Sequence, residues 1–186
     1  MKIVQNLLKV LSLCALVITL GSAKESEMKK AYFSGGCFWG VEYYLEAQNG
    51  VQEVISGFMG GHTKDPIYQE VIYGGTGHIE TVEVVYDASA VSYEELTKLF
   101  FEIHDFTQVG GQGPDRGERY ESYVFYSSQE EKAIVKNLIK ILSDKGYKVA
   151  TKLQKSTSFY SADSYHQDYY ERNNKKPYCH AYKKIF

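Results

Sequence analysis

The chain has 186 residues, a net charge of −2 and a hydrophobic fraction of 44%, a composition typical of a soluble globular protein. This length suits one domain whose core needs no disulfide to hold it together. The net charge is more negative without the first 23 residues, because these contain Lys2 and Lys9 but no acidic side chain. Because the sequence has no basic stripe that could displace counterions, it argues against nucleic-acid binding.

The first 23 residues have the layout of a signal peptide. A weakly basic start precedes the apolar stretch 10–20 and the small residues Gly21-Ser-Ala23. A membrane-spanning helix needs ~20 apolar residues, and this stretch is shorter. We therefore expect cleavage after Ala23, no stable membrane association afterwards, and an exported protein that is periplasmic or secreted. The weaker alternatives are an uncleaved anchor and lipid attachment at Cys14, which follows the bulky Leu13.

Hydrophobic periodicity and turn residues predict the elements of the rest of the chain. Alternating or aromatic runs predict strands, a spacing of three to four residues predicts helices, and Gly and Pro mark the turns. The expected strands are 29–33, 51–59, 78–86 and 120–126, with an extended stretch at 149–159. The expected helices cover 41–47, 67–73, 92–103, a segment from Ser128 to Gly146, and 164–174.

Three of these helices begin with a capping-box pattern, in which Ser92 or Ser128 precedes a Glu, or Ser164 precedes a Gln, by three residues. Residues 104–119 form a long connection rich in Gly and polar side chains, and such loops are often functional. Strands and helices interleave without a strict βαβ repeat. The sequence therefore predicts an α+β two-layer sandwich with a mixed sheet, in one domain (31–186) behind the signal peptide (1–23) and a polar tail (24–30).

The segment Ser34-Gly-Gly-Cys-Phe-Trp-Gly40 joins the first expected strand to the first expected helix. Gly35-Gly36 lets the backbone turn, so Cys37 falls near the first helical turn, where free N–H groups and the helix dipole favour a thiolate. Gly36 and Gly40 leave little bulk beside the sulfur, so we expect room for a substrate there. The alternative is that Cys37 is a small buried hydrophobe, the usual state of a free cysteine.

The motif Gly36-Cys-Phe-Trp-Gly40 resembles the signature of the A-type peptide methionine sulfoxide reductases, which act on methionine-S-sulfoxide. Further segments resemble other blocks of that family, in order along residues 31–180. They are Pro66-Ile-Tyr68 with Gly75-Thr-Gly-His-Ile-Glu80, His104-Asp-Phe-Thr-Gln108 with Gln112-Gly-Pro-Asp115 and Gly117-Glu-Arg-Tyr120, Phe159-Tyr-Ser-Ala-Asp163 with Tyr165-His-Gln-Asp-Tyr169, and Tyr178-Cys179-His180. The resemblance implies a ferredoxin-like core and peptide-methionine (S)-S-oxide reductase activity without a bound cofactor.

The resemblance also implies the nucleophile and the acid. Cys37 would attack the sulfoxide sulfur, and Glu80 would supply a proton to the oxygen. Strand alternation places Glu80 on one face with Val82 and Val84, where burial would raise its pKa. Alternation alone leaves Glu83, on the other face, as an alternative acid.

Five further residues would contact the substrate if the resemblance holds. Tyr68 and Tyr120 would donate hydrogen bonds to the sulfoxide oxygen, and Asp115 would support the groups that bind it. The aromatic side chains of Phe38 and Trp39 would hold the methyl group. Without the resemblance, ordinary core packing or a turn would explain each of them.

The tail residue Cys179 is the second thiol of the mature chain. Attack would leave Cys37 as a sulfenic acid, with which a thiol condenses to a disulfide. The family commonly keeps a resolving cysteine in this region, which implies a Cys37–Cys179 disulfide and its reduction by a thioredoxin-like protein or another dithiol. The alternative is an idle Cys179 and direct reduction of Cys37 by an external thiol. The expected partners are oxidised proteins and peptides and the reductant, with the chain itself a monomer.

Some positions depart from the family pattern. Phe106, Pro114 and Arg119 replace the residues usual in the third block, and the usual Asn-Pro…Gly is missing before Tyr178. The last departure leaves open how well Cys179 reaches Cys37.

Three other functions compete with the reductase interpretation. A metal site is disfavoured because the Cys and His residues lack close, repeated spacing, so no metal is expected. A cysteine hydrolase would need His104 or His166 as a base beside Cys37. A binding module would leave Cys37 inert.

Overall fold

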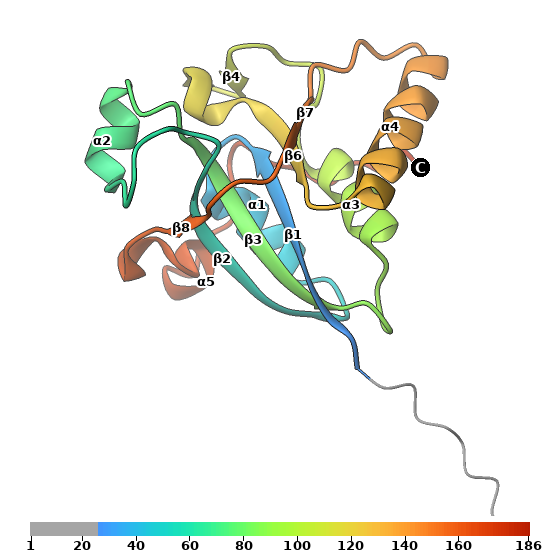
Figure 1. The fold of residues 1–186 in the computed structure, drawn as a ribbon, viewed down its shortest axis with the longest axis horizontal. Helices are drawn as coiled ribbons and strands as arrows, with labels where there is room; N and C mark the ends of the chain where they lie inside the picture. The colour runs from blue at the N-terminus through green and yellow to red at the C-terminus, as the bar shows by residue number, and fades with distance from the viewer. Residues whose placement is uncertain (1–25) are drawn as a thin grey trace, which may run out of the picture.

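The structure, a computed structural model, describes residues 26–186 (Figure 1). The expected signal peptide and the start of the polar tail therefore lie outside the described residues. Six strands form the main sheet, and two more form a small hairpin. The main strands are β1 (Met28–Gly35), β2 (Val51–Met59), β3 (Ile79–Asp87), β6 (Ser122–Tyr126), β7 (Lys152–Lys155) and β8 (Tyr160–Ser161), and the hairpin consists of β4 (Gly111–Gln112) and β5 (Asp115–Arg116).

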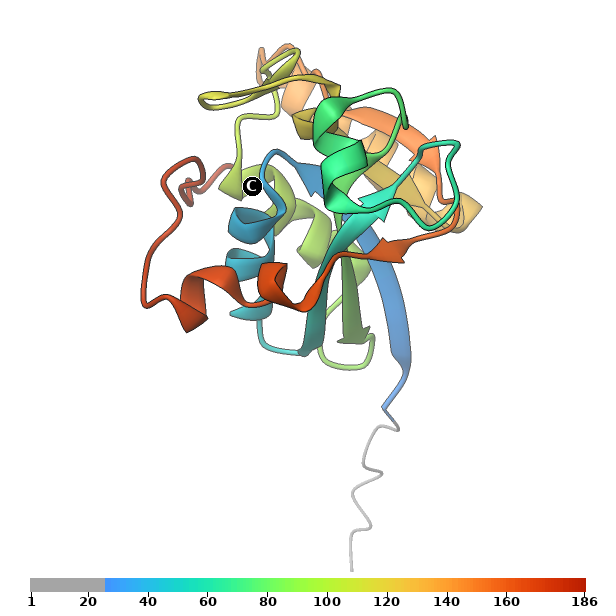
Figure 2. The ribbon, with the colours of Figure 1, turned by 90° about the vertical axis from the view of Figure 1, so that its left-hand side faces the viewer.

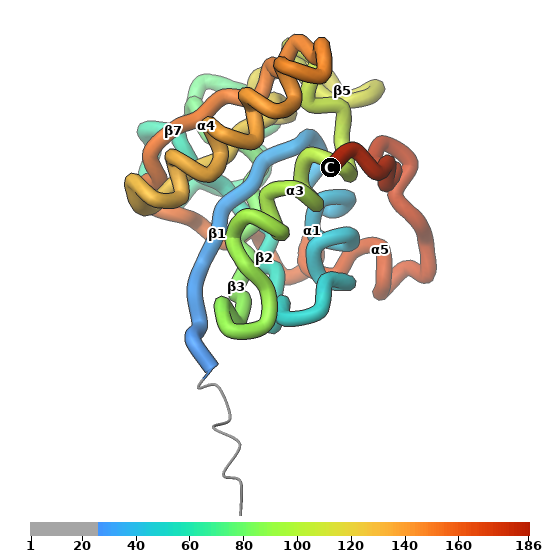
Figure 3. Tube along the Cα trace, turned by 90° about the vertical axis from the view of Figure 1, so that its right-hand side faces the viewer, coloured from blue at the N-terminus to red at the C-terminus, as the bar shows by residue number. Residues whose placement is uncertain are grey.

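The helices are α1 (Phe38–Glu46), α2 (Tyr68–Tyr73), α3 (Tyr93–Ile103), α4 (Gln129–Asp144) and α5 (Tyr169–Arg172). Two short 3₁₀ turns, η1 (Glu118–Tyr120) and η2 (Ser164–His166), lie in the connections. Figure 3 shows α1, α3 and α4 packed along the same face of the sheet. Within residues 26–186, no helix has the length and apolarity needed to cross a membrane.

The sheet has the order β7-β6-β1-β3-β2-β8, with β6 and β7 parallel and the other neighbours antiparallel. The four inner strands, together with α1 and α3, follow the chain order β1-α1-β2-β3-α3-β6. This is the split βαβ arrangement of a ferredoxin-like core. The predictions of an α+β fold and a mixed sheet are confirmed.

The alternation of side chains along β3 decides which of its residues face the core. Val82 and Val84 are fully buried in the core between the sheet and the helices, as expected from their spacing. From the neighbouring strand, Phe33 stacks on Phe100 of α3 with 5.0 Å between ring centroids. Burial of each such side chain contributes roughly 1.5–3 kcal/mol to folding. Since Glu80 belongs to the same alternating set, it is carried into the interior.

The capping predictions at Ser92 and Ser128 are confirmed. The one at Ser164 is wrong, because the Gln167 side chain bonds the backbone of Ser56 and Asp163 is the N-cap of η2. Ser92 Oγ accepts from the Glu95 amide at 3.2 Å, and the Glu95 carboxylate accepts from the Ser92 amide at 2.8 Å. Ser128 Oγ likewise accepts from the Glu131 amide at 3.0 Å. These contacts satisfy backbone donors that the first helical turn leaves free.

Other boundaries differ from the sequence prediction. β1 begins at Met28, so residues 28–30 of the expected tail belong to the sheet. The expected last helix, 164–174, is split into η2 and α5. The break occurs because the Gln167 side chain bonds both backbone groups of Ser56 on β2, and Asp168 takes a left-handed conformation with φ +52°. This split fixes the segment against the sheet beside α1, as Figure 2 shows.

Candidate active site

Cys37 occupies the N-cap of α1, directly after the turn that leaves β1. Gly36 makes this turn with φ +94°, a conformation that favours glycine. The Cys37 side chain is buried, with 8% of its surface exposed. The sequence prediction of its place at a helix start is therefore confirmed.

The expectation of a thiolate at Cys37 is wrong for the resting protein. Burial raises the pKa of the Cys37 thiol well above its ordinary value, and the charge of Glu80 raises it further. The backbone N–H of Trp39 acts in the opposite direction but does not outweigh burial. Desolvation exceeds the effect of the helix terminus here, so the free enzyme holds Cys37 as a thiol.

Glu80 lies next to the start of α1 and is 2% exposed. Its Oε2 accepts a hydrogen bond from the Phe38 amide at 3.2 Å. Burial raises the pKa of Glu80 to about 8, although the Phe38 amide and the charge of Arg119 lower it. A carboxyl group with this pKa carries a proton at neutral pH, as an acid catalyst must.

The alternative acid, Glu83, lies on the opposite face of β3. Its carboxylate forms an ion pair with Lys30 at 2.8 Å and accepts from the Tyr32 hydroxyl at 2.8 Å. Both partners come from β1, so these contacts tie the Glu83 side chain to the neighbouring strand. Of the two carboxyl groups, Glu80 is the one that contacts the first turn of α1 beside Cys37.

Aromatic rings surround the first turn of α1. Trp39 stacks on Tyr169 with 3.7 Å between centroids and an 8° interplanar angle. The ring centroids of Phe38 and Tyr68 lie 6.5 Å apart, and both rings contact the His166 ring. These rings form an aromatic cluster on the two residues that follow Cys37 in the chain.

The two expected hydroxyl donors, Tyr68 and Tyr120, lie near enough to Glu80 for its charge to affect their pKa values. Burial raises the pKa of both Tyr68 and Tyr120, and the charge of Glu80 adds to this effect. Both phenols therefore stay protonated and can donate hydrogen bonds. Tyr120 also stacks under the guanidinium of Arg119, whose central carbon is 4.6 Å from the ring centroid.

Asp115, at the start of β5, is part of the same polar group. Its Oδ1 accepts from the Tyr178 hydroxyl at 3.5 Å, whereas Oδ2 is buried without a partner among residues 26–186. Burial raises the pKa of Asp115, and Arg119 lowers it. Asp115 and Arg119 thus come from the connection 104–119 that the sequence marked as functional, and Tyr120 directly follows it.

The glycines of the motif serve a different purpose from the one expected. A Cβ at Gly36 would collide with the Gln112 side chain, and a Cβ at Gly40 would collide with Nδ1 of His180. Both spaces are filled by the protein itself. The expectation that Gly36 and Gly40 open a path for the substrate is therefore wrong.

Cys179 lies in the tail, which runs past the end of α3 and the start of α1 (Figure 2). Both Cys179 and Cys37 are free thiols in the structure. Cys179 is half-buried and lines a cleft of about 530 Å³ with Asp105, Gln112 and Tyr147. Burial raises its pKa to about 11, and Asp115 adds to the rise.

Either His104 or His166 would have to serve a cysteine hydrolase as its base, and both have other partners. His104 donates from Nδ1 to the Phe100 carbonyl at 2.6 Å and accepts at Nε2 from the Ser122 hydroxyl at 2.8 Å. His166 accepts at Nδ1 from the Trp39 indole N–H at 3.2 Å. His104 is thus committed to the core and His166 to the aromatic cluster, which disfavours a hydrolase.

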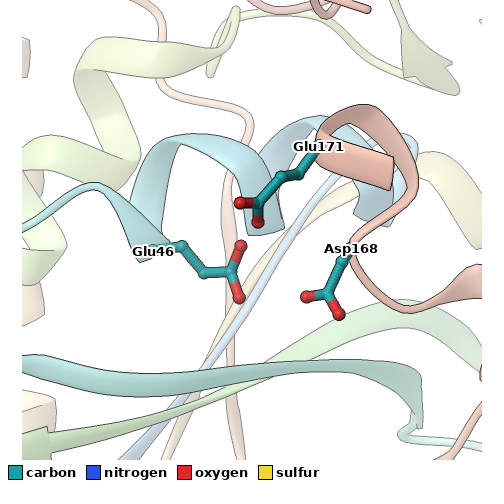
Figure 4. A group of neighbouring side chains, drawn as sticks. All are labelled: Glu46, Asp168 and Glu171. Carbon is teal, nitrogen blue, oxygen red and sulfur yellow. The ribbon is translucent and has the colours of Figure 1, made fainter. Parts of the chain in front are cut away.

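One acidic group in the described part of the chain has the spacing of cation ligands. Glu46, Asp168 and Glu171 each offer an oxygen within 4.8 Å of the others (Figure 4). The group contains neither cysteine, and two of its three members are exposed. Exposed clusters of acidic side chains are also common on protein surfaces that bind no cation.

Sequence reasoning missed several residues that complete the site. Tyr169 and His166 form the back of the aromatic cluster, Arg119 tunes the two carboxyl groups, and His180 fills the space above Gly40. The sequence contained a signal for His180, namely Gly40, a glycine within the segment that forms α1. It could not indicate which side chain would occupy the space.

Comparisons with known proteins agree with this geometry. The family model described as peptide methionine sulfoxide reductase matches residues 29–185. The protein named peptide methionine sulfoxide reductase MsrA from Natronomonas pharaonis is 42% identical over 160 residues, covering 83% of this chain and 90% of its own. The protein of the same name from Nautilia profundicola is 42% identical over 152 residues, covering 82% of this chain and 88% of its own.

Solved structures show the same fold. Methionine sulfoxide reductase A of Corynebacterium diphtheriae has a TM-score of 0.71 and 33% identity, covering 79% of this chain and 76% of that one. The reduced form of Mxr1 from Saccharomyces cerevisiae has a TM-score of 0.78 and 29% identity, covering 88% and 98%. The predicted family is confirmed. The chain belongs to the A-type peptide methionine sulfoxide reductases, and it is an oxidoreductase that reduces methionine sulfoxide.

Proposed function

We propose that the enzyme reduces methionine-S-sulfoxide, free or in oxidised proteins, with Cys37 as nucleophile, Glu80 as acid and Cys179 as resolving thiol. The observation that carries the proposal is the pairing of a thiol at the N-cap of α1 with a buried, protonated carboxyl group held by the next amide along the chain. No bound cofactor is needed for this chemistry, because the sulfur of Cys37 accepts the oxygen.

In the first step, Glu80 gives its proton to the sulfoxide oxygen as Cys37 attacks the sulfur. The sulfur–oxygen bond of the substrate then breaks, and the oxygen passes to Cys37. One thiol and one sulfoxide become one sulfenic acid and one methionine sulfide, so no water is released here. Since Cys37 is a thiol at rest, its proton leaves as the sulfoxide binds and returns to the acid.

The surroundings suit a group that is polar on one side and apolar on the other. Tyr68 and Tyr120 are protonated donors for the sulfoxide oxygen, an arrangement equivalent to an oxyanion hole. Asp115 supports these donors or the substrate backbone through its unpartnered Oδ2. Phe38 and Trp39 form the wall for the methyl group.

In the second step, Cys179 condenses with the sulfenic acid, which forms a Cys37–Cys179 disulfide and releases water. The two thiols are close enough for a charge on Cys179 to raise the pKa of Cys37. A reductant must then attack the disulfide, and Cys179 is the more accessible sulfur because it lines an open cleft.

The reductant in this proposal is a thioredoxin-like protein or another dithiol. The yeast protein Mxr1, whose reduced form is 29% identical to this chain, was also solved in complex with Trx2. The layout of residues 1–23 further supports export, so the reductant would act outside the cytoplasm. We treat the mature enzyme as a monomer without stable membrane association.

Product analysis of one reaction tests the proposal. The reduced protein is mixed with a peptide that contains both epimers of methionine sulfoxide, and the remaining epimer is identified by chiral chromatography. The proposal predicts loss of the S epimer alone, with a Cys37–Cys179 disulfide found in the protein by mass spectrometry. Consumption of the R epimer, or a sulfenic acid that persists beside a free Cys179, would contradict it.

A further inference from the structure

The side chain of His180 joins the tail to the catalytic turn. It is 4% exposed, and its Nε2 lies 2.7 Å from the carbonyl oxygen of Gly35. Its Nδ1 lies 3.0 Å from Sγ of Cys179. The ring rests on Gly40, where a Cβ would displace it. This residue has no part in the mechanism described above.

These contacts determine which nitrogen of His180 carries the hydrogen. A carbonyl oxygen can only accept, so the 2.7 Å contact to Gly35 requires an N–H at Nε2. In the neutral ring, Nδ1 is then unprotonated and acts as an acceptor. The only hydrogen that the Cys179 contact can hold is therefore that of the thiol, directed from Sγ to Nδ1.

We propose that His180 is a catalytic base that takes the proton of Cys179 as this thiol resolves the Cys37 sulfenic acid. The inference rests on the resolving role proposed above for Cys179. In this step the Cys179 S–H bond breaks, its hydrogen passes to Nδ1, and Sγ of Cys179 bonds to Sγ of Cys37. The sulfur–oxygen bond of Cys37 breaks, and the oxygen leaves as water after taking a proton from Glu80. The imidazolium then returns its proton through solvent to Glu80.

Cys179 needs such a base because its own surroundings oppose ionisation. Burial raises its pKa to about 11, and Asp115 and Glu80 add to the rise. At pH 7 the thiolate fraction of an unassisted thiol with this pKa is of order 10⁻⁴. Transfer to a nitrogen 3.0 Å away makes attack possible without a free thiolate, as in paired Cys–His nucleophiles.

The groups that face His180 keep it neutral before the reaction. Burial lowers its pKa to about 4. His104 approaches from the end of α3 and is itself neutral, since burial lowers its pKa to about 3. The Tyr44 hydroxyl of α1 donates to the His180 backbone oxygen at 3.4 Å. Nδ1 is thus available as an acceptor at neutral pH.

The test compares wild type with His180→Gln, in which the Gln amide can still donate to the Gly35 carbonyl but offers no base at the position of Nδ1. His62→Gln, a change at an exposed histidine, is the matched control. Each reduced protein receives one equivalent of a methionine-S-sulfoxide peptide. Methionine is followed by chromatography, and quenching with dimedone divides the protein into sulfenic acid and disulfide.

We expect wild type and His62→Gln to form the disulfide at a rate that is nearly constant between pH 5.5 and 8. In His180→Gln, methionine still forms, the sulfenic acid accumulates, and its conversion is about 100-fold slower at pH 7. That slow rate rises tenfold per pH unit, because a free Cys179 thiolate is now required.

Two results would overturn the inference. One is a His180→Gln protein that forms methionine and converts its sulfenic acid at the wild-type rate. The other, which needs no variant, is a wild-type conversion rate that rises tenfold per pH unit. If wild type forms methionine but never loses the Cys179 thiol, the resolving role itself fails. This outcome is distinct from failure of His180 alone.

Discussion

The amide of Phe38 donates to Oε2 of Glu80 at 3.2 Å, which fastens the buried carboxyl group to the residue that follows Cys37. One hydrogen bond thus sets the position of the proposed acid relative to the proposed nucleophile. It joins β3 to the first turn of α1, the two elements that the core packs together. Several expected outcomes depend on this relationship.

Cys37→Ser should abolish turnover with every reductant, because a hydroxyl cannot accept the sulfoxide oxygen as a thiol does. The substitution changes one buried atom, so we expect the thermal midpoint to stay within a few degrees of wild type. Steady-state methionine release with dithiothreitol measures the loss. Residual turnover above the blank would require a different nucleophile.

Glu80→Gln should reduce the single-turnover rate of methionine formation about 100-fold at pH 7, because the amide cannot release a proton. In wild type the rate should be high below pH 8 and fall above it, since the carboxyl group loses its proton as the pH passes its pKa of about 8. The variant should lack this fall. Glu83→Gln, on the other face of β3, is the matched control and should keep the wild-type profile.

Cys179→Ser should complete one turnover and continue with dithiothreitol, but it should lose thioredoxin-driven recycling. The small dithiol can reach the sulfenic acid directly, whereas the protein reductant needs an accessible disulfide. Coupled assays with each reductant separate the two routes. Full thioredoxin-dependent activity in the variant would show that Cys179 is not the resolving thiol.

Trp39→Ala should raise KM for a peptide substrate about tenfold or more, because it removes the ring that stacks on Tyr169 at 3.7 Å. Trp39→Phe keeps an aromatic surface but loses the hydrogen bond from the indole to His166, so it should have an intermediate KM. Initial rates across substrate concentrations give the comparison. An unchanged KM in Trp39→Ala would remove this side chain from the substrate wall.

Gly40→Ala should destabilise the fold by about 1–3 kcal/mol, because the added methyl group overlaps the His180 ring. Displacement of that ring moves the tail that carries Cys179, so disulfide formation should slow more than methionine formation. Urea unfolding and the two single-turnover signals measure these effects. Equal slowing of both signals would indicate a general loss of fold instead.

The sequence predicted best what depends on local pattern. Alternation in β3 correctly placed Glu80 with Val82 and Val84, and the serine caps of α3 and α4 correctly marked their first turns. These features arise from neighbours in the chain. The break at Gln167 was missed because its cause is a distant partner, the backbone of Ser56.

The electrostatics of the site were harder to predict for the same reason. A helix start suggested a thiolate at Cys37, but burial beneath other segments reverses that effect. The glycines Gly36 and Gly40 suggested open space, yet residues far along the chain fill it. Only the folded arrangement shows that Gln112 and His180 occupy these positions.

The most direct test of the account is a single turnover of the purified chain, fully reduced and then freed of reductant, with a methionine-S-sulfoxide peptide. Methionine and free thiols are counted together. The account predicts one methionine per chain and the loss of both the Cys37 and Cys179 thiols. No methionine from a folded chain would contradict the proposed roles of Cys37 and Glu80, and one methionine with Cys179 still free would contradict the two-cysteine cycle.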